Sequence, residues 1–263
     1  MDMRLQGRTA FVSGSTEGIG YAIASALAAE GVRVTVNGRD AARVEAAVAR
    51  LREEHPGSDP AGLVADFADA AEVARLLDAL GQVDVLVNNV GLFDLVDFDA
   101  ADDAEWTRYL EVNLLSGVRL SRRLLPGMLA RDWGRIVFVG SESGVDVPAD
   151  MIPYGVSKAA MLALGNGLAK RTRGTGVTVN SVVGGPTWSD GVARTVAGIA
   201  AAQGVPTDEM RAAIIGRNPT TLLERFLEPA EIASLVTYLA SPLASATNGA
   251  ALRADGGVLT TTL

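Results

Sequence analysis

Tyr154 and Lys158 stand four positions apart, in the segment Tyr-Gly-Val-Ser-Lys. In a helix this spacing puts both side chains on one face. A tyrosine with an ordinary pKa of about 10 is a poor base at neutral pH, but a neighbouring ammonium group favours the phenolate and lowers that pKa. The pair therefore predicts a proton-transfer site. An ordinary surface pair is the alternative, but the chain has only two lysines, Lys158 and Lys170, and Ser141 offers a nearby hydroxyl that could polarise a carbonyl group.

A second chemical signal lies near the start of the chain, where Gly14, Gly18 and Gly20 follow a strand-like run at residues 9–12. A tight turn, a close backbone approach to a pyrophosphate and close packing of helix on strand all require glycine. The helix that begins after such a turn offers free N–H groups to phosphates. A flexible glycine turn is the alternative, yet strand, turn and helix in this order favour a dinucleotide site.

The end of the second expected strand bears on which dinucleotide binds. An acidic side chain there would hold the adenosine 2′-hydroxyl and repel a 2′-phosphate, but the chain has Gly38 followed by Arg39. A guanidinium group can pair with the 2′-phosphate of NADP, so we expect NADP(H), with NAD(H) as the alternative. Glu17 counts against this, because it occupies a loop position where a basic residue would help. Asp66, after the third strand, either accepts a hydrogen bond from the adenine amino group or caps a helix.

Short β-branched runs alternate with longer alanine-rich runs along the chain. This order predicts right-handed βαβ units, and so an α/β fold of the Rossmann type, with a doubly wound parallel sheet of about seven strands and helices on both faces. The expected strands are residues 9–12, 32–36, 63–65, 83–87, 135–139, 177–183 and 250–253. The expected helices are residues 20–30, 41–54, 72–80, 104–130, 152–173 and 229–239.

Residues 186–227 interrupt this alternation. The segment follows the carboxyl end of an expected strand, is long and carries scattered glycines. Insertions at that edge of a doubly wound sheet lie over the ligand crevice, so we expect a substrate lid there. No linker or internal repeat stands out elsewhere, and residues 1–263 are expected to form a single domain.

The composition argues against several other classes of protein. The formal net charge is −8 without a basic cluster, so nucleic acid is not an expected partner. The chain has no cysteine and one histidine, His55, which excludes a thiolate nucleophile or a cysteine zinc site, and we expect no metal. Because there is neither a run of about 18 apolar residues nor a signal-peptide pattern, we expect a cytoplasmic protein that has no membrane partner.

These motifs resemble the short-chain dehydrogenase/reductase family, in its compact single-domain branch. The likeness covers essentially the whole chain. Ser141 stands thirteen residues before Tyr154, as in the family, with Ser143 as the competitor at eleven. Val90 replaces the usual alanine and Gly184 the usual proline, and neither change removes a catalytic group. The matching segments are Gly14 to Gly20, Asn88-Asn89-Val90-Gly91, Asn113, Ser141 with Tyr154 and Lys158, Asn180 to Thr187, and Asp255-Gly256-Gly257.

The resemblance implies an NAD(P)(H)-dependent oxidoreductase that moves a hydride between the cofactor and a carbonyl or secondary alcohol. In this family pattern, Tyr154 transfers the proton to or from a substrate oxygen that Ser141 binds. Lys158 holds the nicotinamide ribose and lowers the tyrosine pKa, and Asn113 holds a water that passes the proton to solvent. The implied cofactor-binding residues are Gly14, Ser15, Thr16, Glu17, Gly18, Ile19, Gly20, Arg39, Asp66, Phe67, Asn89, Val90, Gly91, Tyr154, Lys158, Gly185, Pro186 and Thr187.

The substrate is less constrained. The candidate pocket residues are all apolar, which favours a medium-sized, mostly uncharged ketone or alcohol. A reductase of 3-oxoacyl groups on a carrier protein or CoA is the alternative, although Asp132 stands near the position where such enzymes carry a basic residue. A non-catalytic nucleotide sensor tends to lose the Tyr/Lys pair, and a related isomerase or dehydratase is usually longer. Relatives commonly form tetramers or dimers, so we expect a homo-oligomer. The candidate pocket residues are Phe93, Leu95, Val145, Met151 and Trp188.

Overall fold

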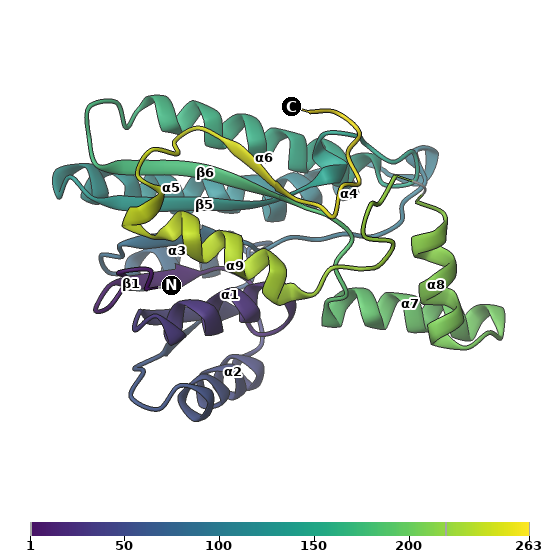
Figure 1. Cartoon of the computed structure of the whole chain (residues 1–263), viewed down its shortest axis with the longest axis horizontal. Coiled ribbons are helices and arrows are strands. Elements are labelled where there is room, and N and C mark those ends of the chain that lie inside the picture. Colours follow the sequence, from purple (N-terminus) through teal and green to yellow (C-terminus); the bar gives the residue numbers. More distant parts are fainter. Residues whose placement is uncertain (1, 219, 263) are drawn as a thin grey trace.

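A parallel sheet of seven strands runs through the computed structural model, which describes residues 2–218 and 220–262 (Figure 1). The spatial order is β3-β2-β1-β4-β5-β6-β7, so the chain begins mid-sheet and winds outward in two directions. The order reverses between β1 and β4, where sheets of this type open a crevice for ligands. The predicted Rossmann-type α/β fold is therefore confirmed. The strands are β1 (Thr9–Val12), β2 (Arg33–Gly38), β3 (Ala61–Val64), β4 (Val85–Asn88), β5 (Gly134–Ser141), β6 (Val177–Gly184) and β7 (Ala251–Ala254).

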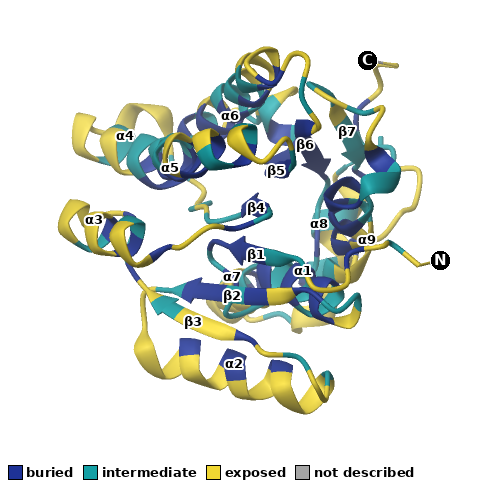
Figure 2. Ribbon diagram, turned by 90° about the vertical axis from the view of Figure 1, so that its left-hand side faces the viewer, coloured by how far each residue is buried: buried dark blue, intermediate teal, exposed yellow. Residues whose placement is uncertain are grey.

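Helices cover both faces of this sheet, and the central strands β4, β5 and β6 are buried at every residue (Figure 2). This is why their sequences are nearly continuous apolar runs rather than alternating ones. None of the described helices is both long and apolar enough to cross a membrane. One core holds α1 (Gly18–Ala29), α2 (Ala41–Glu54) and α9 (Pro229–Ala240). The other holds α3 (Ala70–Ala79), α5 (Ser116–Ala130) and α6 (Ile152–Lys170).

The helical region before β5 is less regular than expected. Instead of one helix over residues 104–130, α4 (Asp103–Tyr109) passes through a π-helical segment, Leu110–Leu115, into α5. Short π-helical segments occur often at functional sites, where they redirect a side chain. Here the segment carries Asn113, whose buried amide bonds to the backbone of Leu92.

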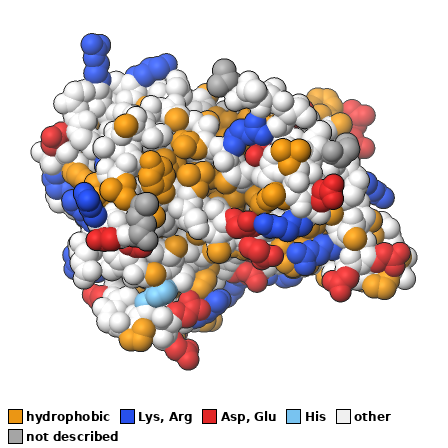
Figure 3. All heavy atoms as spheres, in the orientation of Figure 1, with side chains coloured by type: hydrophobic (Ala, Val, Ile, Leu, Met, Phe, Trp, Pro, Cys, Tyr) orange, Lys and Arg blue, Asp and Glu red, His pale blue; other side chains and the backbone are white. Residues whose placement is uncertain are grey.

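The expected lid folds into two helices beside the carboxyl ends of the strands, α7 (Asp190–Gln203) and α8 (Thr207–Gly216) (Figure 1). It has a small core of its own, formed by Val196, Ala200 and Met210. Two backbone hydrogen bonds close its base, from the Trp188 N–H to the Leu227 carbonyl (2.7 Å) and from the Leu227 N–H to the Pro186 carbonyl (2.8 Å). On the face shown in Figure 3, acidic and basic side chains are interspersed over the surface.

Candidate active site

The glycine-rich turn between β1 and α1 has the geometry that its sequence predicts. Gly14 and Gly18 have φ values of +60° and +58°, which disfavour any side chain. A Cβ at Gly20 would collide with the Gly14 carbonyl oxygen, so α1 can begin this close to the turn only with glycine there. The Asn89 amide, at the end of β4, donates to the Ser13 carbonyl (3.0 Å) and the Gly14 carbonyl (2.8 Å). The turn is thus fixed in place across the switch point.

Two buried polar residues support this turn from below. The Asn37 Oδ1 atom accepts a hydrogen bond from the Gly14 N–H at 3.1 Å. The Ser15 hydroxyl is fully buried and donates to the Val12 carbonyl at 2.6 Å, while it accepts from the Asn37 N–H at 3.0 Å. Ser15 therefore uses its side chain inside the protein and offers a ligand only its backbone. The sequence reasoning missed Asn37, because a polar residue within an apolar strand shows its purpose only when its partner is known.

The N-terminus of α1 contacts a carboxylate at the start of α7. The Gly18 N–H donates to Asp190 Oδ2 at 2.7 Å, across a sequence separation of 172 residues. A helix N-terminus attracts anions through its free N–H groups and its dipole, so this position can bind a negatively charged group. A bound pyrophosphate would compete with Asp190 for the same region. The sequence reasoning did not find Asp190.

Glu17 is neutralised by two arginines. Its carboxylate accepts from both Arg194 nitrogens, at 2.9 and 2.5 Å, and lies 2.5 Å from an Arg43 nitrogen. Hydrogen bonds from Arg194 hold the pKa of Glu17 down to about 2, against burial and together with Arg43. The negative charge of Glu17, which counted against NADP in the sequence, is therefore compensated by the positive charges of Arg43 and Arg194. Arg39 is exposed just beyond the end of β2.

Three more residues predicted to bind the cofactor, Thr16, Asp66 and Phe67, lie near the ends of β2 and β3. A Cβ at Gly38 would lie 2.6 Å from the Thr16 methyl group, so this pair packs closely. Asp66 forms a turn, in which its Oδ1 atom accepts from the Ala68 N–H at 2.9 Å. Phe67 is buried in the core between the sheet and α3, so its ring does not face solvent.

The proton-transfer candidates meet at the carboxyl ends of β4 and β5. Lys158 is buried, and its Nζ atom donates to the Val139 carbonyl at 2.9 Å and lies 5.7 Å from the centre of the Tyr154 ring. Gly91 lies alongside, since a Cβ there would be 3.4 Å from Lys158 Nζ and 3.6 Å from Asn113 Oδ1. The structure therefore brings Asn113 beside the Tyr154 and Lys158 pair, from which it is far apart in the sequence.

Asn113 has little freedom. Its Oδ1 atom accepts from the Leu92 N–H at 2.7 Å, and its amide nitrogen donates to the Leu92 carbonyl at 3.0 Å and to Ser157 Oγ at 2.9 Å. Ser157 in turn donates to the Tyr154 carbonyl at 2.6 Å. Both amide protons are engaged within the protein, so only the second lone pair of Oδ1 is left for a water. Ser157 lies inside the Tyr-x-x-x-Lys motif but was not predicted as a site residue.

The pKa expected for Tyr154 was wrong for the protein alone. Burial is the largest effect and raises the pKa of the phenol above its ordinary value, although the Ser141 hydroxyl opposes the rise. Lys158 is not among the groups that shift the pKa of this phenol, and burial lowers the pKa of the lysine amine to about 8. An ammonium group in an apolar wall is costly in its charged form, so the tyrosine and the lysine are both shifted toward neutrality.

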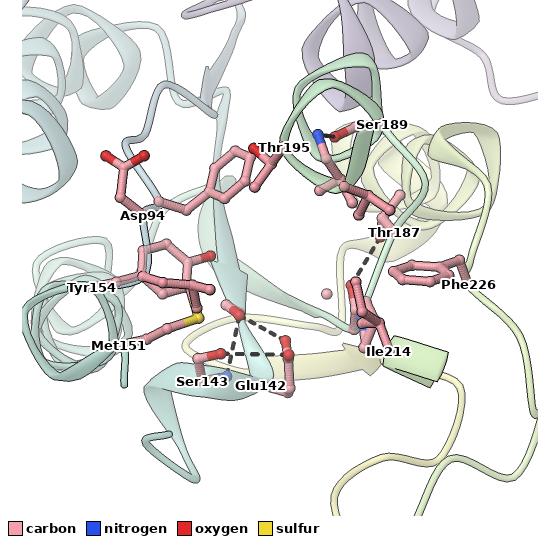
Figure 4. A pocket seen from close by; sticks show the side chains of 18 of the residues that line it. Asp94, Glu142, Ser143, Met151, Tyr154, Thr187, Ser189, Thr195, Ile214 and Phe226 are labelled. Carbon is pink, nitrogen blue, oxygen red and sulfur yellow. Dashed lines mark hydrogen bonds between the residues drawn. The ribbon is translucent and has the colours of Figure 1, made fainter. Parts of the chain in front are cut away.

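Ser141 ends β5 and is joined to its two neighbours in the chain. Its hydroxyl donates to Glu142 Oε2 at 2.6 Å and accepts from the Ser143 N–H at 3.1 Å. The Ser143 hydroxyl contacts Glu142 Oε1 at 3.4 Å (Figure 4). Burial raises the pKa of Glu142, and the hydrogen bond from Ser141 counteracts it. The sequence reasoning weighed Ser141 against Ser143 and overlooked the carboxylate between them.

A cavity of about 650 Å³ extends from these groups to helices α7 and α8. Tyr154, Ser141 and Glu142 form one side, and Ile19 lines it from the glycine-rich turn. Among the predicted pocket residues, Phe93, Leu95 and Met151 line the cavity, and so do Gly185, Pro186 and Thr187. Two predicted pocket residues are not part of its lining: Val145 is exposed, and Trp188 packs edge-to-face on Phe226, with ring centres 5.3 Å apart.

The segment after β6 is supported by the end of the chain. A Cβ at Gly185 would lie 2.5 Å from the Asp255 carbonyl oxygen, so only glycine allows this approach. Asp255 is buried, and its carboxylate accepts from Arg253 Nε at 3.0 Å and from the Leu259 N–H at 3.1 Å. The Thr187 hydroxyl donates back to the Gly185 carbonyl at 2.9 Å. The closing Asp-Gly-Gly motif thus acts as a structural support for the cavity wall.

The switch-point crevice, its glycine-rich turn and the Tyr/Lys pair define an oxidoreductase of the dinucleotide-binding type, and the comparisons with known proteins agree. A family model for short chain dehydrogenases matches residues 8–200. The uncharacterized oxidoreductase YvrD of Bacillus subtilis is 42% identical over 264 residues, covering 98% of this chain and 99% of that protein. The chain belongs to the short-chain dehydrogenase family.

Two further relatives have more specific names. The 3-oxoacyl-[acyl-carrier-protein] reductase FabG of Vibrio cholerae is 32% identical, covering 97% of this chain and 99% of that protein. The crystal structure of L-sorbose reductase from Gluconobacter frateurii, complexed with NADPH and L-sorbose, superposes with a TM-score of 0.93 at 29% identity and covers 99% of this chain and all of that one.

Proposed function

We propose that this protein is an NADP(H)-dependent oxidoreductase that interconverts a medium-sized ketone and the corresponding secondary alcohol. The observation that carries the proposal is the meeting of Tyr154 and Ser141 at one mostly apolar cavity, which also reaches Ile19 in the glycine-rich turn. A substrate oxygen against the two hydroxyls would therefore lie beside a bound dinucleotide. The relationship to an NADPH-complexed sugar reductase supports the same cofactor.

The residues at the crevice fit a nicotinamide dinucleotide. The turn at Gly14, Gly18 and Gly20 allows close backbone approach, and the N-terminus of α1 favours the pyrophosphate. Lys158 is a buried amine that forms no ion pair within the described residues, and it would bind the nicotinamide ribose hydroxyls. Thr187 and Gly91 would lie beside the nicotinamide. When bound, the cofactor supplies or accepts the hydride.

The protein itself handles the proton. In reduction Tyr154 donates its proton to the substrate oxygen, and in oxidation it removes one. The phenol is protonated at neutral pH, as the donor role requires, but burial raises its pKa and so makes the proton harder to release. Lys158, as an ammonium group, stabilises the phenolate that remains after transfer. Ser141 lies beside Tyr154 and holds the substrate oxygen in line with it, which fixes the distance over which the proton moves.

Replacing Arg39 with alanine should weaken NADPH specifically. A charge-assisted hydrogen bond to the 2′-phosphate would be lost, which corresponds to a rise in KM for NADPH of about 10–100-fold. The KM for NADH should stay within about twofold, because NADH lacks that phosphate. Arg33→Ala is the matched control, since Arg33 is exposed at the opposite end of β2. Equal increases in KM for NADPH and NADH would show that Arg39 does not bind the 2′-phosphate.

An absorbance screen at the reduced-nicotinamide band tests the proposed function. NADPH and NADH are each mixed with the enzyme and with ketones, aldehydes, sugars, steroids and acetoacetyl-CoA. We expect consumption of NADPH with uncharged ketones. The acyl thioester is included because FabG is a relative, and a preference for it would favour the 3-oxoacyl reductase alternative. Failure of every substrate to oxidise either cofactor would contradict the proposal.

A further inference from the structure

Glu142 places a carboxylate inside the cavity, directly after Ser141. Both side chains line the cavity. Figure 4 shows Glu142 and Ser143 next to each other, in the same pocket that Tyr154 lines. The Ser141 hydroxyl donates to Glu142 Oε2 at 2.6 Å. Burying a carboxylate without a cationic partner costs free energy, so this carboxylate in a mostly apolar pocket does not stabilise the fold.

The second oxygen of this carboxylate is weakly used. Glu142 Oε1 has a long contact of 3.4 Å with the Ser143 hydroxyl, and the backbone N–H groups of Glu142 and Ser143 also face the carboxylate. Across residues 2–218 and 220–262, no arginine, lysine or histidine forms an ion pair with Glu142. A carboxylate can accept about four hydrogen bonds, so this one can take another donor from the cavity. A bound donor would also favour the ionised form, which burial now disfavours.

The contact between Ser141 and Glu142 has a consequence for the reaction. A serine hydroxyl has one proton, and in this structure it goes to the carboxylate. A carbonyl oxygen that binds at Ser141 therefore receives no hydrogen bond from this hydroxyl, because the serine proton points to Glu142. A substrate donor that occupies Glu142 Oε2 would weaken this hold and free the serine proton for the carbonyl.

We propose that Glu142 is a specificity-determining residue that binds a hydrogen-bond donor, a hydroxyl or an ammonium group, on the carbon next to the substrate carbonyl. This inference rests on the proposed function. Oxygens on neighbouring carbons are about one hydrogen-bond length apart, which matches the 2.6 Å between the two protein oxygens that would receive them. One substrate can thus contact Ser141 and Glu142 together.

The other charges of the cavity agree with such a substrate. Asp94 and Asp150 also line it, and Arg217 is the basic residue in its lining. Asp94 forms an ion pair at 3.4 Å with Arg108, and Arg108 is not part of the cavity lining. With acids in excess, the cavity disfavours a carboxylate or phosphate beside the carbonyl and accepts a neutral or cationic donor.

Three ketones that share a pentyl chain test this inference. On the other side of the carbonyl they carry a hydroxymethyl, an aminomethyl or an ethyl group. With the wild-type enzyme and NADPH, we expect kcat/KM for one or both donor-bearing ketones to exceed that for the ethyl ketone by about 10–100-fold. In Glu142→Leu this ratio should fall to about one, because the variant has no carboxylate to accept the hydrogen bond from the donor group.

Glu142→Gln identifies the donor. It should keep part of the preference if the donor is a hydroxyl, and lose it if the donor is an ammonium group. Asp146→Asn is the control, because Asp146 is exposed on the same loop and lies outside the cavity lining. The proposal is overturned if the wild type does not prefer a donor-bearing ketone, or if Glu142→Leu slows all three ketones equally.

A binding measurement separates this inference from the proposed function. Calorimetry with NADP⁺ present, where no hydride can pass to a ketone, gives the affinity for each of the three ketones in the wild type and in Glu142→Leu. A donor preference that disappears in the variant supports the role of Glu142 even if the activity screen fails. Equal affinities in both proteins would refute it even if the enzyme proves active.

Discussion

Tyr154→Phe should lower kcat by about 10²–10⁴-fold, the range that a positioned general acid contributes. The variant keeps the ring and loses only the hydroxyl, so the cavity and α6 should be unchanged. Lys158 and the glycine-rich turn remain in place, and the Kd for NADPH should stay within about twofold. Steady-state turnover with the best ketone and a fluorescence titration of NADPH measure the two quantities.

Tyr238→Phe provides the matched control for this experiment. Tyr238 lies on α9 and packs against the core on the α1 side of the sheet, away from the cavity lining. This variant should retain wild-type turnover. If Tyr154→Phe were also near wild type, the proton would have to come from another group, and the assignment of Tyr154 would be wrong.

Lys158→Met should remove activity and stabilise the cofactor-free protein at the same time. Loss of the ammonium removes both the ribose contact and the charge that stabilises the phenolate, so we expect kcat/KM to fall by at least about 10²-fold and NADPH affinity to fall with it. Burial lowers the pKa of this amine to about 8, so holding it charged at pH 7 costs folding free energy. Methionine fills a similar volume without that cost, and the free energy of unfolding should rise by about 1–3 kcal/mol.

The pH dependence of this stability difference follows from the direction of the shift. Below pH 8 the native and unfolded states both hold the proton, and the full cost of the buried charge is present. Between the native pKa of about 8 and the ordinary value of 10.5, the native state has lost the proton while the unfolded state keeps it, so the wild type gains stability as pH rises. Denaturant unfolding of wild type and Lys158→Met should therefore converge toward pH 10. Lys170→Met, an exposed position at the end of α6, should show neither effect.

Local sequence signals were sufficient for most of the fold. Residues 41–54 were predicted as a helix with the observed limits, because amphipathic spacing follows Asp40, whose side chain caps the helix at the Arg43 N–H. Near the glycine-rich turn, α1 begins at Gly18 rather than residue 20, since the turn and the first helical residues overlap there. The π-helical segment at Leu110–Leu115 could not be predicted, because its Asn113 bonds to Leu92 across the fold.

The site was only partly predictable for the same reason. Tyr154, Lys158, Ser141 and Asn113 were found because their types and spacing match a family pattern, and the fold brings them to one edge of the sheet. The contact between Gly18 and Asp190 joins residues 172 positions apart, which no local pattern reveals. Glu142 had a weak signal, a carboxylate between two serines directly after an apolar strand. Its significance became visible only when the cavity was known.

Hydride tracing shows whether the hydride of the cofactor reaches the carbonyl carbon of the substrate. NADPH carrying deuterium at the transferred position of its nicotinamide ring is incubated with the enzyme and the best ketone, and the product is analysed by mass spectrometry and NMR. We expect deuterium on the carbinol carbon of a secondary alcohol, with NADP⁺ formed in equal amount, and about 10²–10⁴-fold less of this labelled alcohol from Tyr154→Phe over the same time. A product isomeric with the substrate and free of deuterium would contradict it.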